Sequence, residues 1–346
     1  GALDYLINIW NYFFNLNKSL LNKSGNFSFT QRINKQSIDF NNPIHVLLND
    51  DTTPDLNKNI TPFDYNKVKF QVKNYQGGGF LLDTEQGRAA NVYVHVANCL
   101  NMVEKYTPMF NTWAGTNNLI VLPNAGKDFN AFYNRRSMQF FSGKDPVRGV
   151  HIHTSKSSDI VTHELGHAVL DSFRPDTWSV AALEVWSFHE AFADITAFLY
   201  ILQYEEIISR FVEQTNGDLR KENVACSLAE SMGEAIFNLT KDTSRPKNYL
   251  RSALNDFKYV NPGTLPESAP DHLLAAECHS FGRVFLGAFY DIFEMIYQSA
   301  IESGKSPKEA VVEARDTLGN YVFKAIKNAP LCVNFYESMC KTILWV

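Results

Sequence analysis

The feature that most constrains this chain is a pair of histidines that flank a glutamate at helical spacing. His163 and His167 lie four residues apart in DIVTHELGHAV, residues 159–169. Four residues of an α-helix make about 400° of turn, so both imidazoles leave the same face, one turn apart. Glu164 lies about 100° around the helix from His163, so its carboxylate can reach a metal-bound water without ligating the metal. The stretch predicts a helix with two zinc ligands and a general base.

The same HExxH string also arises by chance on exposed helices, so its surroundings matter. The flanking residues are apolar and predict that the rest of the helix is buried: Ile160, Val161, Leu165, Ala168, Val169 and Leu170. The two histidines would then lie at the edge of a core. This pattern favours a metal site over a solvated surface helix.

A catalytic zinc site needs a third protein ligand, and WSFHEAFADI (186–195) supplies a candidate. Glu190 and Asp194 lie four residues apart, where two carboxylates repel each other on an ordinary helix. The repulsion is explained if Glu190 binds a cation and Asp194 accepts a hydrogen bond from the far nitrogen of a ligating histidine. The alternative, two solvated acids, is disfavoured by apolar neighbours: Phe188, Ala191, Phe192, Ala193 and Ile195.

Strand-like patterns dominate before residue 157 and helical patterns after it. A glycine turn at 75–83 is predicted to lead into another short strand, and 88–109 is predicted to be helical. Further strands are predicted at 44–50, 67–75, 118–124, 129–133, 137–141 and 149–153, and long helices at 272–301 and 306–327. We therefore predict an α+β fold with an irregular N-terminal arm (1–42), a β-rich part (43–156) and an α-helical part (157–346).

Composition excludes several classes of protein. A net charge of −5 over 346 residues, without a basic run, argues against nucleic-acid binding. No stretch reaches the roughly 18 apolar residues of a membrane span, and YLINIWNYFF (5–14) lacks the basic leader and cleavage site of a signal peptide. The five cysteines are an odd number, which argues against a complete disulfide framework.

The motifs together resemble the thermolysin family of zinc metalloendopeptidases. HELGH and HEAFAD are similar to the family's two zinc-binding helices, and FNAFYN (129–134) followed by MQFFSG (138–143) is similar to its edge strand and hairpin. CHSFGRVF (278–285) resembles the helix start that carries the family's catalytic histidine. All four occur in the family's order. The resemblance implies a two-lobed fold with the zinc site between a β-rich lobe and a helical lobe.

The resemblance implies hydrolysis of internal peptide bonds, with zinc bound by His163, His167 and Glu190. The ion would activate a water and polarise the scissile carbonyl. Glu164 would accept the water's proton and pass it to the leaving amine. His279 would hydrogen-bond the oxyanion, although a histidine at a helix start can also be a simple capping or packing residue.

Four residues are expected to contact the substrate. Asn130, Ala131 and Tyr133 lie on the edge strand, along which an extended peptide could add; an edge strand without this role is the alternative. Among Arg245, Arg251 and Arg283, we favour Arg251 as the arginine near the substrate carbonyl.

The chain departs from the family's pattern at three places. The loop before Glu190 contains Trp178 and Trp186 but not the expected tyrosine. Ile201 stands where the family's paired calcium site has an acid, so a calcium ion is possible but the paired site is not expected. Asp159 matches a position where the family often has a calcium-binding acid, but we favour an N-terminal acid stabilised by the helix dipole. Either Asp271 or Glu277 would support His279.

We therefore expect a monomeric zinc endopeptidase that acts on peptides or proteins. A pseudopeptidase that binds peptides without cleaving them, or a zinc exopeptidase, are the alternatives. Members of the family are usually exported from the cell, so the resemblance implies export. His151 and His153 share one strand face, and we read them as a strand pair rather than a second metal site.

Overall fold

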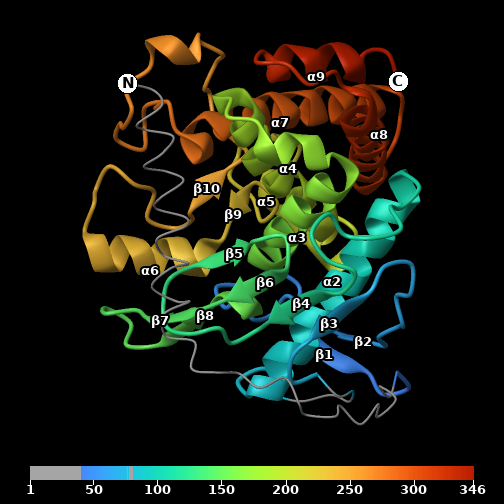
Figure 1. The fold of residues 1–346 in the computed structure, drawn as a ribbon, viewed down its shortest axis with the longest axis vertical. Helices are drawn as coiled ribbons and strands as arrows, with labels where there is room; N and C mark the ends of the chain where they lie inside the picture. Colours follow the sequence, from blue (N-terminus) through green and yellow to red (C-terminus); the bar gives the residue numbers. More distant parts are fainter. Residues whose placement is uncertain (1–39, 76, 78–80) are drawn as a thin grey trace. The chain divides into compact units, whose positions relative to one another are not determined.

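The computed structural model of the chain describes residues 40–75, 77 and 81–346 (Figure 1). Asp39–Val346 form one compact unit. Most of the arm predicted for 1–42, and residues 76 and 78–80 of the predicted glycine turn, lie outside the described residues. Residues 81–83 form no strand, so the strand expected after the glycine turn is not found in the part of it that is described.

The β-structure consists of short strands in several small sheets. β1 (Ile44–Leu47) pairs antiparallel with β2 (Asn57–Ile60), and β7 (Ser142–Lys144) with β8 (His151–His153). The four-stranded sheet has the order β3-β4-β6-β5, which leaves β5 at its outer end. Its strands are β3 (Phe70–Val72), β4 (Leu119–Leu122), β5 (Ala131–Tyr133) and β6 (Ser137–Phe140), and a last two-stranded pair joins β9 (Ser227–Leu228) to β10 (Arg251–Ser252).

Helices form most of the chain after residue 157. One long helix, α2, comes before this point. The α-helices are α2 (Glu85–Tyr106), α3 (Ser158–Phe173), α4 (Leu183–Ile201), α5 (Glu205–Thr215), α6 (Glu230–Thr240), α7 (Cys278–Glu302), α8 (Pro307–Asn328) and α9 (Phe335–Ile343). None of these described helices is long and apolar enough to cross a membrane.

The predicted α+β class is confirmed, and most predicted strands are present in shortened form. β2 was not predicted because its sequence, NKNI, contains weak strand formers and exposes its polar side chains. Its pairing with β1 is a tertiary contact that the local sequence pattern does not predict. The change of texture near residue 157 coincides with the start of α3 and falls within the compact unit.

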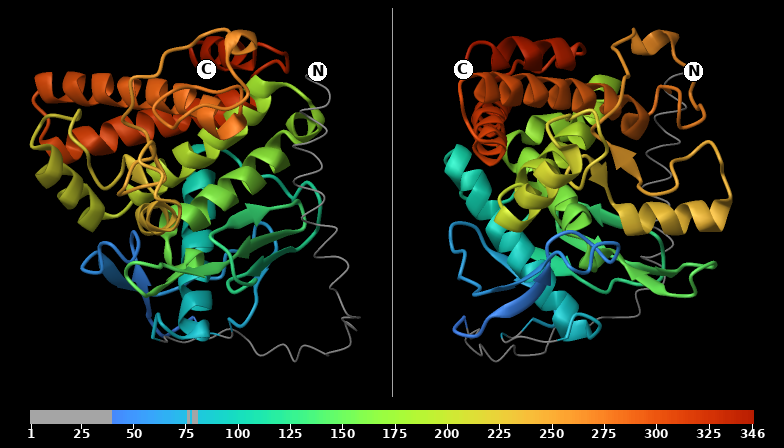
Figure 2. Two further views of the ribbon diagram at one scale, coloured as in Figure 1. Left: turned by 90° about the vertical axis from the view of Figure 1, so that its left-hand side faces the viewer. Right: turned by 180° about the vertical axis from the view of Figure 1, so that it is seen from behind.

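Three helices pack closely around the region of the sequence motifs. α4 packs against both α3 and α7, as both views of Figure 2 show. It is apolar and buried over nearly its whole length, as expected of a core helix. Two glycines permit the close contacts: a Cβ on Gly166 would lie 2.8 Å from the Cα of Ala193, and one on Gly282 would lie 3.0 Å from the carbonyl oxygen of Ser187. The spacing of α3, α4 and α7 is thus set by the absence of two side chains.

Candidate metal centre

Three side chains from α3 and α4 bring their donor atoms together. The Nε2 atoms of His163 and His167 are 3.2 Å apart. Glu190 places Oε2 at 3.5 Å from Nε2 of His163 and Oε1 at 3.5 Å from Nε2 of His167. Ligand atoms bound at about 2.0–2.1 Å in a tetrahedral zinc site lie roughly 3.4 Å from each other. The spacing therefore fits three ligands of one tetrahedral ion.

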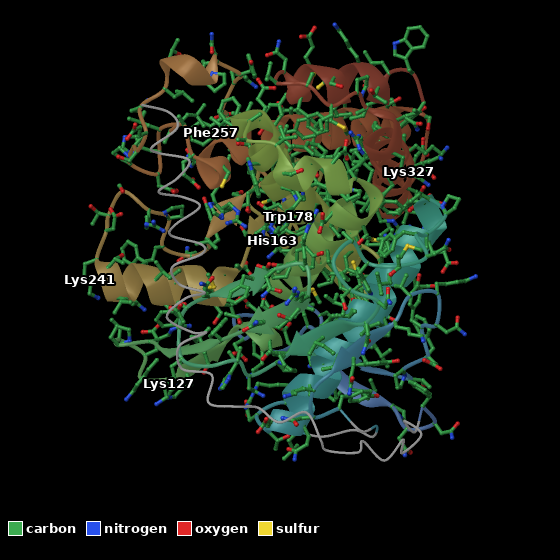
Figure 3. The ribbon with its side chains drawn as sticks, in the orientation of Figure 1. Lys127, His163, Trp178, Lys241, Phe257 and Lys327 are labelled. Atoms are coloured by element: carbon green, nitrogen blue, oxygen red, sulfur yellow. The ribbon has the colours of Figure 1, made fainter. Side chains whose placement is uncertain are left out.

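The hydrogen bonding of these atoms also fits a cation. Oε2 of Glu190 is buried and has no hydrogen-bond partner among the described residues. A buried, unpaired carboxylate oxygen is costly. The two histidine nitrogens face each other, where one proton at most can lie between them. The three side chains are each mostly buried, and Figure 3 labels His163 among the side chains of the helical region. These residues can hold a metal ion.

Asp194 holds the ring of His163 in the orientation that a metal ligand needs. Its Oδ1 lies 2.7 Å from Nδ1 of His163, which makes Nδ1–H the donor and leaves Nε2 for a metal. Arg251, on β10, donates to the same carboxylate through Nε at 2.7 Å and a terminal nitrogen at 2.9 Å. Burial opposes ionisation of Asp194, but Arg251 and His163 hold its pKa well below the usual range. The carboxylate thus stays charged.

We expect Asp194→Asn to weaken metal binding by about 10–100-fold, the range for outer partners of metal-bound histidines. An amide can donate toward Nδ1 and so favour the tautomer that has its proton on Nε2. Equilibrium dialysis against zinc, followed by elemental analysis, measures the change. Asp171→Asn is the matched control, because Asp171 also binds an arginine, Arg135, through both carboxylate oxygens. Equal losses in both variants would contradict this role of Asp194.

Glu164 is a buried carboxyl group beside these ligands. It is only 7% exposed, and no hydrogen bond of its carboxylate to a described residue is found. Burial raises its pKa to about 7, with the charge of His163 opposing and that of Glu190 adding to the shift. A carboxyl group with this pKa exchanges a proton near neutral pH, which is what a general base requires.

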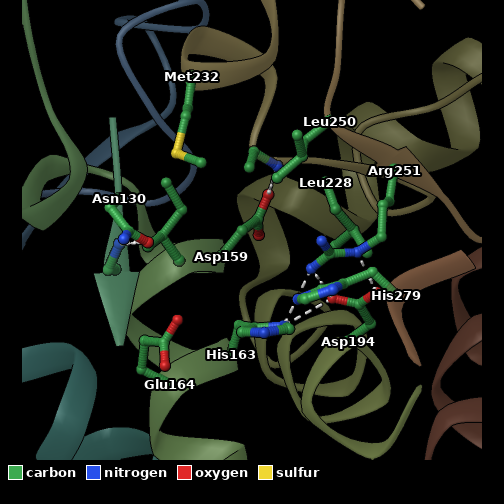
Figure 4. A pocket seen from close by; sticks show the side chains of 13 residues that line it. Asn130, Asp159, His163, Glu164, Asp194, Leu228, Met232, Leu250, Arg251 and His279 are labelled. Carbon is green, nitrogen blue, oxygen red and sulfur yellow. Dashed lines mark hydrogen bonds and ion pairs between the residues drawn. The ribbon is translucent and has the colours of Figure 1, made fainter. Parts of the chain in front are cut away.

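A cavity lies beside His163 and brings together most of the predicted site residues (Figure 4). The other two candidate metal ligands, His167 and Glu190, are not among the residues that line it. His163, Asp194, Arg251 and His279 lie together on one side of the cavity, and Glu164 lies apart from this group. Ala131, the first residue of the outer strand β5, and Asn130, just before it, also line the cavity. The remaining wall is largely apolar, formed by Ile160, Leu228, Ala229, Met232 and Leu250, with Asp159 among them.

His279 is positioned by the residue that begins its helix. Glu277 is the N-cap of α7 and accepts from the backbone N–H groups of His279 and Ser280. Its Oε1 also lies 2.6 Å from Nδ1 of His279, so Glu277, and not Asp271, is the supporting acid. Burial opposes ionisation of Glu277, yet the hydrogen bond and charge of His279 lower its pKa to about 2. Nε2 of His279 is left facing the cavity, 3.4 Å from Oε1 of Glu190.

Of the four predicted substrate-binding residues, three line the cavity and one, Tyr133, does not. Asn130 and Ala131 reach the cavity but bond to each other, because Oδ1 of Asn130 accepts from the backbone N–H of Ala131 at 2.9 Å. Tyr133 does not line the cavity; it is buried, and its hydroxyl donates to Asp171 at 2.8 Å. Arg251 lines the cavity, but its guanidinium is paired with Asp194. A substrate would therefore compete with existing contacts.

Asp159, at the edge of the cavity, belongs to a buried group of acids. It is 3% exposed, and its Oδ2 accepts a long hydrogen bond, 3.4 Å, from the backbone N–H of Ala229. Asp50 and Glu230 are its charged neighbours, and burial raises the pKa of all three. The interpretation of Asp159 as a simple helix-terminal acid therefore omits its main surroundings. The ordinary dipole benefit is opposed by burial and by two like charges.

We expect Glu230→Gln to stabilise the fold more at pH 8 than at pH 5. Burial, and next the charge of Asp50, raise the pKa of folded Glu230 to about 8. A raised pKa means that the folded state binds the proton more tightly, so stability falls as pH rises from the unfolded value near 4.3 through about 8. Glutamine removes this loss, which we expect to amount to about 1–3 kcal/mol.

Urea unfolding of the parent and Glu230→Gln at both pH values, in the presence of a calcium chelator, measures the difference. Glu302→Gln, an exposed residue at the end of α7, serves as the control. A Glu230→Gln effect that is the same at the two pH values would show that the carboxylate is ionised in the folded state throughout.

Cys278, His151 and His153 are further potential metal ligands. Cys278 lies with Glu190 and His279 in a second group of potential metal ligands, which the sequence reading missed although Cys278 directly precedes His279. His151 and His153 have ring centres 6.2 Å apart but join no group of three ligands among the described residues. No tyrosine is part of the described lining, in agreement with the sequence of the loop before Glu190.

No model of a known protein family matches the sequence, and a comparison with curated proteins found no match either.

Proposed function

We propose that the chain is a zinc-dependent endopeptidase with the two-lobed architecture of the thermolysin family. The observation that carries the proposal is the convergence of two histidine nitrogens 3.2 Å apart with the carboxylate of Glu190, which has one oxygen 3.5 Å from each of them, beside the buried carboxyl group of Glu164. Two imidazoles and one carboxylate are the donor set of many catalytic zinc sites with an open fourth position. Zinc bound there would polarise a carbonyl and lower the pKa of water.

The chain's own residues would then move the protons and hold the substrate. Glu164 accepts a proton from the attacking water and delivers it to the leaving amine. His279 donates through Nε2 to the oxyanion, with its ring fixed by Glu277. Asn130 and Ala131 hold an extended peptide along the outer strand β5 by main-chain hydrogen bonds.

The apolar wall of the cavity favours substrates with an apolar side chain. Leu228, Met232 and Leu250 would contact one substrate side chain by burial of apolar surface. Peptides with a large apolar residue next to the cut bond are therefore expected to be the better substrates.

Cleavage of internally quenched peptides by the zinc-loaded protein tests the proposal. Peptides blocked at both ends should be cut as well as peptides with a free amino terminus, whereas an exopeptidase would require the free end. Treatment with a chelator should stop cleavage, and added zinc should restore it. Zinc binding without cleavage of any peptide would instead favour a peptide-binding protein that lacks an effective oxyanion donor.

A further inference from the structure

A second group of three potential ligands overlaps the first. One donor atom each from Glu190, Cys278 and His279 lies within 4.8 Å of the other two. Glu190 belongs to both groups: Oε1 lies 3.5 Å from Nε2 of His167 on one side and 3.4 Å from Nε2 of His279 on the other. A single carboxylate thus faces two sets of donors, and a carboxylate has enough lone pairs to bridge two cations.

The beginning of α7 presents the other two donors together. Cys278 and His279 are the first residues of this helix, and its N-cap Glu277 fixes the first turn through the backbone of His279 and Ser280. Sγ of Cys278 lies 3.5 Å from Nδ1 of His279 and 3.2 Å from the carboxylate of Glu277. The contact of Gly282 with α4 holds this turn against Glu190, because a Cβ there would lie 3.2 Å from the Cβ of Glu190.

We propose that Glu190, Cys278 and His279 form a second metal site, which takes a soft divalent cation such as Zn²⁺ or Cd²⁺. Thiolate and imidazole ligands select such ions over magnesium or calcium. The side chain of His279 is 45% exposed and lines the cavity, so an ion can enter from that side. Binding replaces the thiol proton of Cys278, which leaves to solvent.

The second site fills after the first. It lies at the N-terminus of α7, where the helix dipole disfavours a cation. It also has to share Glu190, whose charge is then divided between two ions. The first site, in contrast, has a histidine ring already oriented by Asp194.

An ion in the second site would inhibit the enzyme. This step rests on the proposed function, because it requires His279 to donate to the oxyanion. Nε2 of His279 cannot both ligate an ion and donate a hydrogen bond. Excess zinc or cadmium should therefore stop cleavage at concentrations above those that fill the first site.

Cadmium titration of the purified protein tests the second site without reference to activity. The parent is expected to show the ultraviolet absorption of a cadmium–thiolate bond, and Cys278→Ser is expected to lose it and to bind one ion fewer. The double variant Cys332→Ser/Cys340→Ser, which removes the two exposed thiols, is the matched control and should keep the absorption. Circular dichroism confirms that each variant is folded, and Cys278→Ala provides a second replacement of the thiol.

Absorption that is absent from the parent, that survives in Cys278→Ser, or that disappears in the double variant would overturn the proposal. His167→Gln should keep the absorption, since His167 belongs only to the first group. A result with this variant therefore tests the second site even if the proposed function is wrong. For inhibition, Cys278→Ser is expected to raise the half-inhibitory cadmium concentration by about tenfold or more. Unchanged inhibition with the absorption lost would overturn the inhibitory role.

Discussion

Replacing Glu164 by glutamine is expected to lower kcat on an internal peptide by about 10²–10⁴-fold, the usual contribution of a general base. Glutamine has nearly the same shape but cannot accept the proton. The side chain is buried, and no described residue hydrogen-bonds its carboxylate, so the substitution breaks no such bond. The loss should appear in kcat and in kcat/KM by the same factor, since the proton moves only in the transition state.

Zinc content must be measured on the same samples, because the expected result is an inactive protein that still holds its ion. Glu213→Gln, on the exposed face of α5, is a control for the chemical change itself. If the Glu164→Gln protein cleaves at the parent's rate, Glu164 is not the general base. A variant that loses zinc as well would make Glu164 a ligand instead of a base.

The grouping of the candidate zinc ligands could be predicted in part, because helical periodicity places residues four apart on a shared face. His163 with His167, and Glu190 with Asp194, are each four residues apart, and this spacing alone places each pair on one side of its helix. The apolar residues beside both motifs also predicted that the two helices are buried. The contact between the two helices was less readable, although Gly166, inside the motif, is the residue that permits it.

Contacts between distant segments were beyond the sequence pattern. Arg251 was predicted to be an arginine of the site, but not to bind Asp194. The bidentate bond joins residues 57 positions apart, and Arg251 lies on a strand of only two residues. Tyr133 was expected to meet substrate, yet the side chain is buried against Asp171. In both cases tertiary packing decides which polar group becomes the partner. A motif gives the residue, whereas packing gives its orientation.

Zinc is expected to stabilise the folded parent, and His167→Gln is expected to abolish this effect. A ligand that binds only the folded state adds about 2.7 kcal/mol at a free concentration of 100 times its Kd. Loss of a direct ligand should weaken binding by more than the about 10–100-fold typical of outer partners. Glutamine at residue 167 lacks the ring nitrogen that lies 3.2 Å from Nε2 of His163.

Thermal unfolding with and without zinc, after removal of bound metal by a chelator, measures the stabilisation. His151→Gln is the matched control, because it replaces an exposed histidine of β8 outside the site. A parallel series in the Cys278→Ser background excludes any ion held at the start of α7. If zinc stabilises His167→Gln as it does the parent, while His151→Gln loses the effect, the ion binds elsewhere and the reading of α3 and α4 as one metal centre fails. If only His167→Gln loses the effect, the two helices share an ion whether or not the protein cleaves peptides.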